Sequence, residues 1–200
     1  MLNSIAEYCV SGLEKNLKVS EDEREVYVYG FELLLSTVIN MIALLAVSLL
    51  VGNALYFVSF LVFFYSIRLF CGGFHAKTYI RCFILTNSVF ILLITLTNII
   101  SNSHIDVKAV ILALLLLSAI IIFIFSPVRN VHHPYSEKKY RDFRVISRCL
   151  SVIYSIICSC VVMLKYGKAA IFSALSLISV SVLILIQKII YTGGEKDESP

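Results

Sequence analysis

The chain has 200 residues, of which 59% are hydrophobic and only 15% are charged, and its mean hydropathy is +0.90. A soluble domain is about half apolar and about a quarter charged, so this composition excludes an ordinary soluble protein and predicts an integral membrane protein. The net charge of +4 is modest, and no nucleic-acid motif accompanies it. We therefore expect no nucleic-acid partner.

Residues 1–20 carry an apolar stripe at steps of three and four. Its members are Leu2, Ile5, Cys9, Leu13 and Leu17. This spacing predicts an N-terminal amphipathic helix, which lies either flat on the membrane or packed against the other helices. Charged residues such as Glu7 and Lys15 interrupt the stretch, so it does not read as a removable signal peptide.

Six further stretches are apolar enough to cross a hydrocarbon layer of about 30 Å, which takes roughly 20 helical residues. They are residues 27–51, 54–70, 82–101, 108–126, 146–164 and 169–191. The predicted fold is therefore all-α, a bundle of six transmembrane helices in a single domain over residues 1–200. A basic loop at 127–148 and a polar tail at 192–200 complete it.

The placement of positive charge predicts the orientation. If the N-terminus is cytoplasmic, all but three of the 17 Lys and Arg residues fall on cytoplasmic segments. The three exceptions are Lys108, Lys165 and Lys168. Because Lys and Arg collect on the cytoplasmic side of membrane proteins, we expect both termini, the segment between the second and third spans, and the basic loop to be cytoplasmic.

The segment at residues 68–82, RLFCGGFHAKTYIRC, joins the second and third predicted spans. A turn between spans needs only a few polar residues, so the reactive and charged residues of this segment indicate a functional role. The candidate site residues of this segment are Arg68, Gly72, Gly73, His75, Lys77, Arg81 and Cys82. A thiolate is a strong nucleophile, and a neighbouring imidazole can take its proton and later protonate a leaving amine. His75 and Cys82 supply that pair.

The spacing of this pair requires a bent backbone. On one unbroken helix His75 and Cys82 would lie about 10.5 Å apart along the axis, too far for a hydrogen bond. Gly72 and Gly73 allow a loop that folds His75 back toward the start of the next helix. There the helix dipole and Arg81 would stabilise a negative Cys82, and free N–H groups could hold an oxyanion.

Cys71 is the alternative nucleophile, because it precedes His75 by four residues and would meet it on a continuous helix. The glycine pair argues against that helix and favours Cys82. An ordinary packing role for both thiols is the other interpretation, since membrane cysteines are commonly structural.

Other polar residues supply further candidates. Glu32 and Asn87 lie inside predicted spans, where an ionisable group is functional by default, so Glu32 is a candidate to orient His75. Glu32 also lies near the entry of its span, where it can simply meet water or a cation. His132 and His133 have no partners at metal-ligand spacing, so we expect no metal site. The six cysteines lack paired spacing, and we expect neither a disulfide nor a cofactor.

Arg68, Gly72-Gly73, His75-Ala76 and Cys82 together resemble the core of the accessory gene regulator B family, AgrB. The length, the six predicted spans and the basic loop with Pro127 and Pro134 are similar to the same family. Members are bacterial membrane endopeptidases that process the precursor of a quorum-sensing peptide. The resemblance thus implies a location in the bacterial cell membrane.

The resemblance also implies residue roles. The family's nucleophilic cysteine falls on Cys82, its base on His75, and its required arginine and glycine on Arg68 and Gly73. Lys77 and Arg81 are expected to support substrate binding. The substrate would be a precursor peptide of the AgrD type, cleaved through an acyl-enzyme thioester and closed into a thiolactone or lactone ring. A homodimer is expected.

Two other classes of function fit the composition. A small transporter or peptide exporter would use polar groups within the membrane without covalent chemistry. A passive membrane scaffold would need neither His75 nor Cys82. Only the enzyme predicts loss of function and loss of a thioester when Cys82 is replaced.

Overall fold

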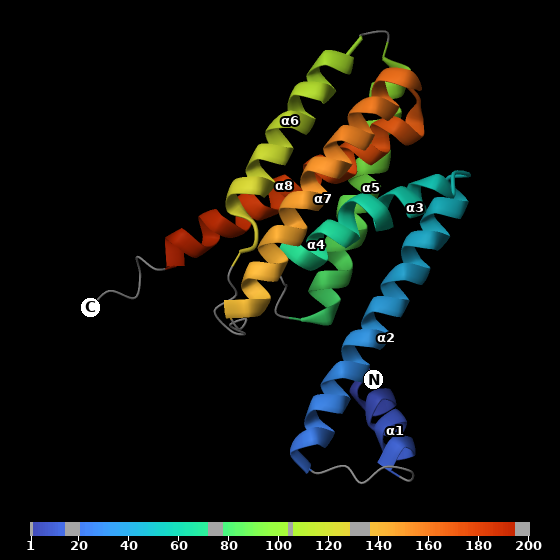
Figure 1. The fold of residues 1–200 in the computed structure, drawn as a ribbon. Helices are drawn as coiled ribbons and strands as arrows, with labels where there is room; N and C mark the ends of the chain where they lie inside the picture. The colour runs from blue at the N-terminus through green and yellow to red at the C-terminus, as the bar shows by residue number, and fades with distance from the viewer. Residues whose placement is uncertain (1, 15–20, 72–77, 104–105, 129–136, 195–200) are drawn as a thin grey trace. The chain divides into compact units, whose positions relative to one another are not determined.

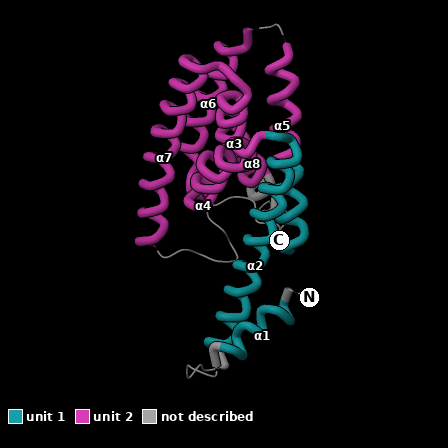
Figure 2. The backbone as a smooth tube through the Cα atoms, turned by 90° about the vertical axis from the view of Figure 1, so that its right-hand side faces the viewer, with its two compact units in different colours: residues 1–52, 76–88 teal, residues 53–75, 89–200 magenta. Residues whose placement is uncertain are grey.

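The structure is a computed structural model that describes residues 2–14, 21–71, 78–103, 106–128 and 137–194 (Figure 1). These residues form helices joined by short turns, with no strand among them, which confirms the predicted all-α class. The chain divides into two compact units, drawn in different colours in Figure 2. Unit 1 comprises residues 1–52 and 76–88, and unit 2 comprises residues 53–75 and 89–200.

Unit 1 begins with α1 (Leu2–Glu14), which packs against α2 (Glu21–Leu50). The fully buried side chains of α1 are Ala6 and Val10, whereas Ile5 is 45% exposed. The face of α1 that is buried is therefore one position away from Ile5 and Cys9 of the predicted apolar stripe. A helix is present at the N-terminus, and its placement on a membrane surface stays a prediction.

The remaining helix of unit 1 is the first part of α5 (Tyr79–Asn102). Two hydrogen bonds join it to α2. The Tyr79 hydroxyl donates to Glu32 Oε2 at 3.1 Å, and Asn87 Nδ2 donates to Asn40 Oδ1 at 2.8 Å. Both bonds join residues 47 positions apart, so the two helices run parallel and in constant register. First and third spans of a membrane bundle are expected to run in the same direction.

Unit 2 starts with a continuous helical stretch made of α3 (Leu55–Phe60), the π-helical turn η1 (Leu61–Tyr65) and α4 (Ser66–Cys71). The π-helical turn is shown by the Ser66 N–H, which donates to the Leu61 carbonyl five residues earlier. The Ser66 hydroxyl donates to the Val62 carbonyl and can accept from the Tyr154 hydroxyl, which lies 3.2 Å away. This wide turn therefore packs against a neighbouring helix through a polar contact.

Unit 2 is completed by the rest of α5, α6 (Lys108–Phe125), α7 (Glu137–Leu164) and α8 (Lys168–Gly194). Its core is aromatic. The ring centroids of Phe60 and Phe90 lie 4.9 Å apart, and those of Tyr56 and Phe172 lie 4.6 Å apart. Edge-to-face and stacked rings of this kind add to the stabilisation that burial provides. The core thus joins three helices distant in sequence.

Small polar side chains let the helices of unit 2 approach closely. On α7 the buried residues Ser147, Ser151 and Ser155 recur every four positions. Ser118 of α6 donates to Ser181 of α8 at 3.2 Å, and Ser173 of α8 donates to Ser59 at 3.1 Å. Without a hydrophobic driving force between helices in lipid, such packing and hydrogen bonds hold them together.

Five helices of the described chain are long and apolar enough to cross a membrane. They are Glu23–Leu50, Tyr79–Asn102, Lys108–Phe125, Glu137–Leu164 and Lys168–Ile189. The second predicted span corresponds to Leu55–Cys71, which is apolar but shorter than these five. The structure is therefore compatible with a multi-pass membrane protein, and the count of six spans is not confirmed.

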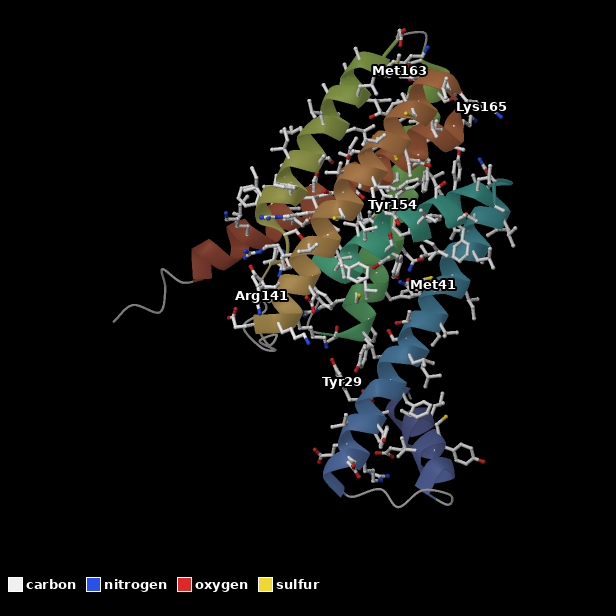
Figure 3. All side chains as sticks on the ribbon, in the orientation of Figure 1. Tyr29, Met41, Arg141, Tyr154, Met163 and Lys165 are labelled. Atoms are coloured by element: carbon white, nitrogen blue, oxygen red, sulfur yellow. The ribbon has the colours of Figure 1, made fainter. Side chains whose placement is uncertain are left out.

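The helix α7 begins at Glu137, inside the stretch where the sequence predicts a basic loop up to residue 148. Figure 3 labels Arg141 near this end of α7 and Met163 near the other. The extension is amphipathic. Phe143 stacks edge-on against Phe70 of α4 at 5.7 Å, while Arg141 is exposed. Arg148 donates through Nε to the Phe123 carbonyl at 3.0 Å, which caps the C-terminus of α6 with a cation.

We predict measurable energetic coupling between Asn40 and Asn87. In a double-mutant cycle of Asn40→Leu and Asn87→Leu, unfolding by SDS in lipid–detergent micelles should give a coupling of about 0.6 to 1.7 kcal/mol, the range for such bonds in membrane helices. The control pairs Asn40→Leu with Thr95→Val, because the Thr95 hydroxyl bonds only to Ile91 of its own helix in the described structure. Additive energies for the Asn pair itself would contradict the prediction.

Candidate functional site

Cys82 lies in the first turn of α5, and the local hydrogen bonds explain why the helix begins there. Thr78 Oγ1 accepts from the Arg81 N–H at 3.3 Å, and the Thr78 carbonyl accepts from the Cys82 N–H at 3.1 Å. Thr78 is therefore the N-cap of α5. Cys82 is the residue at which the regular helical ladder starts. Its side chain is half-buried and Arg81 beside it is exposed.

Cys71, the alternative nucleophile, has a different environment. Its side chain is 0% exposed at the end of α4. Its carbonyl accepts a hydrogen bond from the Val128 N–H at 2.9 Å, so the end of α4 is tied to the segment that follows α6. A thiol that is fully packed cannot reach a peptide bond without a rearrangement of the helices around it. The geometry therefore favours Cys82 over Cys71 as a reactive thiol.

Four predicted site residues, Gly72, Gly73, His75 and Lys77, lie outside the described residues. Their approach to Cys82 stays a prediction. What the structure does describe is each end of this segment. Cys71 is held on one side by Val128, and Thr78 caps α5 on the other.

Arg68 lies on α4 of unit 2, whereas Cys82, Arg81 and Glu32 all belong to unit 1. The Arg68 guanidinium lies 5.5 Å from the centre of the Phe64 ring, and the side chain is half-exposed. A cation over an aromatic face keeps its charge while its stem is packed against apolar surface. Arg68 is thus held as a cation at the end of an apolar helix.

Glu32 has a hydrogen-bond donor that the sequence did not reveal. Its carboxylate accepts from Tyr79, a residue three positions before Cys82 on the same helix. Residues three apart are neighbours on a helix surface, so this bond holds the turn that also carries Cys82. Within unit 1 the structure therefore brings together Glu32, Tyr79 and the turn that carries Cys82.

Asn87 has a structural partner. Besides Asn40, it donates to the Phe83 carbonyl of its own helix at 2.8 Å. An amide bonded in this way joins two helices, and both N–H groups of its nitrogen have acceptors. We therefore assign Asn87 to packing between α2 and α5 and not to catalysis.

Three residues near the candidate site escaped the sequence analysis: Asn40, Thr78 and Tyr79. The sequence contains a pattern that could have indicated each of them. Thr78 stands directly before an apolar helical run, which is a common N-cap position. On α2, Glu32 and Asn40 are separated by about two helical turns, and Tyr79 and Asn87 have the same separation on α5. Matched polar spacing on two spans can indicate that they pair.

No group of three or more His, Cys, Asp or Glu residues with the geometry of a metal site occurs in the ranges that the structure describes. His132 and His133 lie outside those ranges. The chemistry available to the described site is that of a thiol, a hydroxyl, a carboxylate and backbone N–H groups.

Comparison with known proteins agrees with the resemblance noted in the sequence. One protein of known name, accessory gene regulator protein B from Staphylococcus saprophyticus subsp. saprophyticus, is 29% identical to this chain over 129 residues. The similar region covers 64% of this chain and 66% of that protein, just under two thirds of its length. No solved structure matches. The family model described as accessory gene regulator B matches residues 6–190, and the chain therefore belongs to that family.

Proposed function

We propose that this protein is a membrane cysteine endopeptidase that removes the C-terminal tail from a quorum-sensing precursor peptide of the AgrD type. Membership of the accessory gene regulator B family supports the link to that precursor. The observation that carries the chemistry is the position of Cys82, half-buried on the first turn of a capped helix, while Cys71 is fully packed.

The first step is acylation of Cys82. His75 takes the proton of the Cys82 thiol, and the sulfur attacks the carbonyl carbon of the peptide bond before the tail. The Tyr79 and Ile80 N–H groups precede the regular helical ladder and can donate to the oxyanion that forms, whereas the Arg81 N–H already donates to Thr78. The C–N bond then breaks, and His75 returns the proton to the leaving amine. The tail departs and an acyl-enzyme thioester remains.

The second step closes the ring. The thiol or hydroxyl of an internal residue of the peptide attacks the thioester carbonyl, and its proton passes to the departing Cys82 sulfur. Exchange of one thioester for another is nearly balanced in free energy, so release of the tail or removal of the ring draws the reaction forward. Water would hydrolyse the thioester, and a site at the membrane boundary limits its access.

Several cations of the chain suit an anionic substrate. Arg68 can bind a carboxylate through two parallel hydrogen bonds. Lys77 and Arg81 precede the nucleophile in sequence, by five residues and by one. The exposed residues Lys138, Lys139 and Arg141 at the start of α7 can attract an acidic tail or lipid phosphates toward the same side of the membrane.

Replacement of the nucleophile tests the proposal. Cys82→Ala and Cys82→Ser should lower the rate of tail release by more than about 10³-fold, because loss of a nucleophile removes the covalent pathway. The assay uses purified protein in lipid vesicles with a precursor peptide, and mass spectrometry detects the tail and the hydroxylamine-sensitive thioester. His75→Ala should behave in the same way.

Cys71→Ala and the exposed-site change Cys149→Ala serve as matched controls and should keep the thioester. A Cys82→Ala protein that still cleaves the precursor would show that the proposal is wrong. Export of peptide by that variant, with no cleavage by the wild type, would favour a transporter instead.

A second prediction concerns the accessibility of the two thiols. In variants that retain a single cysteine, Cys82 should react with a membrane-permeant maleimide faster than Cys71, since the Cys71 side chain is 0% exposed. Each rate is divided by the rate for the same variant in denaturing detergent, which removes differences in intrinsic reactivity. Equal protection of both thiols would contradict the described packing of α4.

A further inference from the structure

The bond between Tyr79 and Glu32 lies next to the proposed nucleophile. Tyr79 is the first residue of α5 after the N-cap, and Cys82 follows on the same face of the same turn. The 3.1 Å bond from the Tyr79 hydroxyl to Glu32 Oε2 therefore ties the turn that carries the sulfur to α2. Any rotation of this turn would have to stretch or break that bond.

The environment of Glu32 favours its hydrogen bond with Tyr79. Glu32 lies half-buried on α2, within a helix that is long and apolar enough to cross a membrane. A carboxyl group in apolar surroundings is costly unless its oxygens accept hydrogen bonds. Tyr79 meets this need, so the two side chains stabilise each other.

A second contact shows why the Tyr79 bond is not redundant. Asn87 and Asn40 join the same helices in the same register about two turns further along. Cys82 lies between the two bonds. The Asn pair sets the register of α5 against α2 well inside the helix, but a helix end can still fray. The bond at Tyr79 is the one that restrains the first turn.

We propose that Tyr79 is a positioning residue for Cys82, which it holds in register with α2 through its hydrogen bond to Glu32. The inference rests on the proposed function, because it assumes that Cys82 is the nucleophile. Glu32 then acts as the acceptor for Tyr79. This role differs from orienting His75, for which the negative charge of a carboxylate would be needed to stabilise the imidazolium.

The two roles of Glu32 make opposite predictions for one conservative change. The side chain in Glu32→Gln keeps a carbonyl oxygen that can accept from Tyr79, but it carries no charge. If Glu32 holds Tyr79, Glu32→Gln retains most of the activity and Glu32→Leu does not. If Glu32 orients the imidazole by its charge, both variants lose activity together.

The experiment measures the pre-steady-state burst of Cys82 acylation, with purified protein in lipid vesicles and the precursor peptide in excess at several concentrations. Tyr79→Phe should lower the acylation rate by about 10- to 100-fold, since a displacement near 1 Å costs a reaction about that much, and KM should stay within about twofold. Glu32→Leu should match it. The double variant should be no slower than either single variant, because one interaction is lost in all three.

Two Tyr→Phe changes serve as matched controls. Tyr27→Phe makes the same change at an exposed position on α2, and Tyr154→Phe removes the hydroxyl that contacts Ser66 in unit 2. Both should acylate at the wild-type rate. If Tyr79→Phe does not fold, judged by SDS unfolding, the comparison of Glu32→Gln with Glu32→Leu still tests the inference.

The inference is overturned if Tyr79→Phe acylates within about twofold of the wild type, or if Glu32→Gln is as slow as Glu32→Leu. It is supported if Tyr79→Phe and Glu32→Leu are slow while Glu32→Gln is not. These results are separable from failure of the proposed function, which would appear as a Cys82→Ala protein that still cleaves. An inactive Cys82→Ala with a fast Tyr79→Phe would leave the function standing and remove only the positioning role.

Discussion

A chain that crosses hydrocarbon must bond its backbone N–H and C=O groups within itself, because lipid offers no partners. The described part of this chain meets that constraint with helices alone. The groups at each helix end need other partners, and the structure supplies several of them. Arg148 donates a hydrogen bond to a carbonyl near the end of α6, and the Val128 N–H donates to one at the end of α4. Thr78 caps the start of α5.

The same constraint explains where the polar side chains lie. Within a span a polar side chain is costly unless it bonds to its own helix or to a neighbouring one, and several pairs here do so. Side-chain hydrogen bonds join Asn87 to Asn40, Tyr79 to Glu32, and Ser118 to Ser181. Polar contacts between helices therefore do two things here: they satisfy groups that lipid would leave exposed, and they define how one helix is rotated against the next.

The spans were predictable because hydropathy is a local sum over about 20 residues, which sequence alone supplies. The predicted stretch 82–101 corresponds to α5, and 108–126 corresponds to α6. The start of α7 was not predicted, because a hydropathy sum does not detect the charged turns before residue 148, which are helical and contact α4 through Phe143 and Phe70. Pairing of Glu32 with Tyr79 likewise depends on two helices meeting, which no single segment encodes.

The candidate site was predictable to a different degree. Cys82 and His75 stood out from their neighbours because a thiol and an imidazole followed a glycine pair. That pair favoured Cys82 over Cys71, and the family resemblance strengthened the choice. Burial then gave an independent reason for the same choice, since Cys71 is fully packed. The role of Tyr79 could not be inferred from its own segment, because a tyrosine at a membrane boundary is commonly an interfacial anchor.

The π-helical turn at Leu61–Tyr65 changes the direction in which side chains project before and after it on the short apolar helix. One extra residue in a turn rotates everything after it by about 100° relative to a regular helix. The residues before the turn face the aromatic core at Phe60. The residues after it, which include Arg68 and Cys71, point in directions that differ from those of a regular helix. A helix divided in this way can accommodate changes around Arg68 without repacking the aromatic core around Phe60.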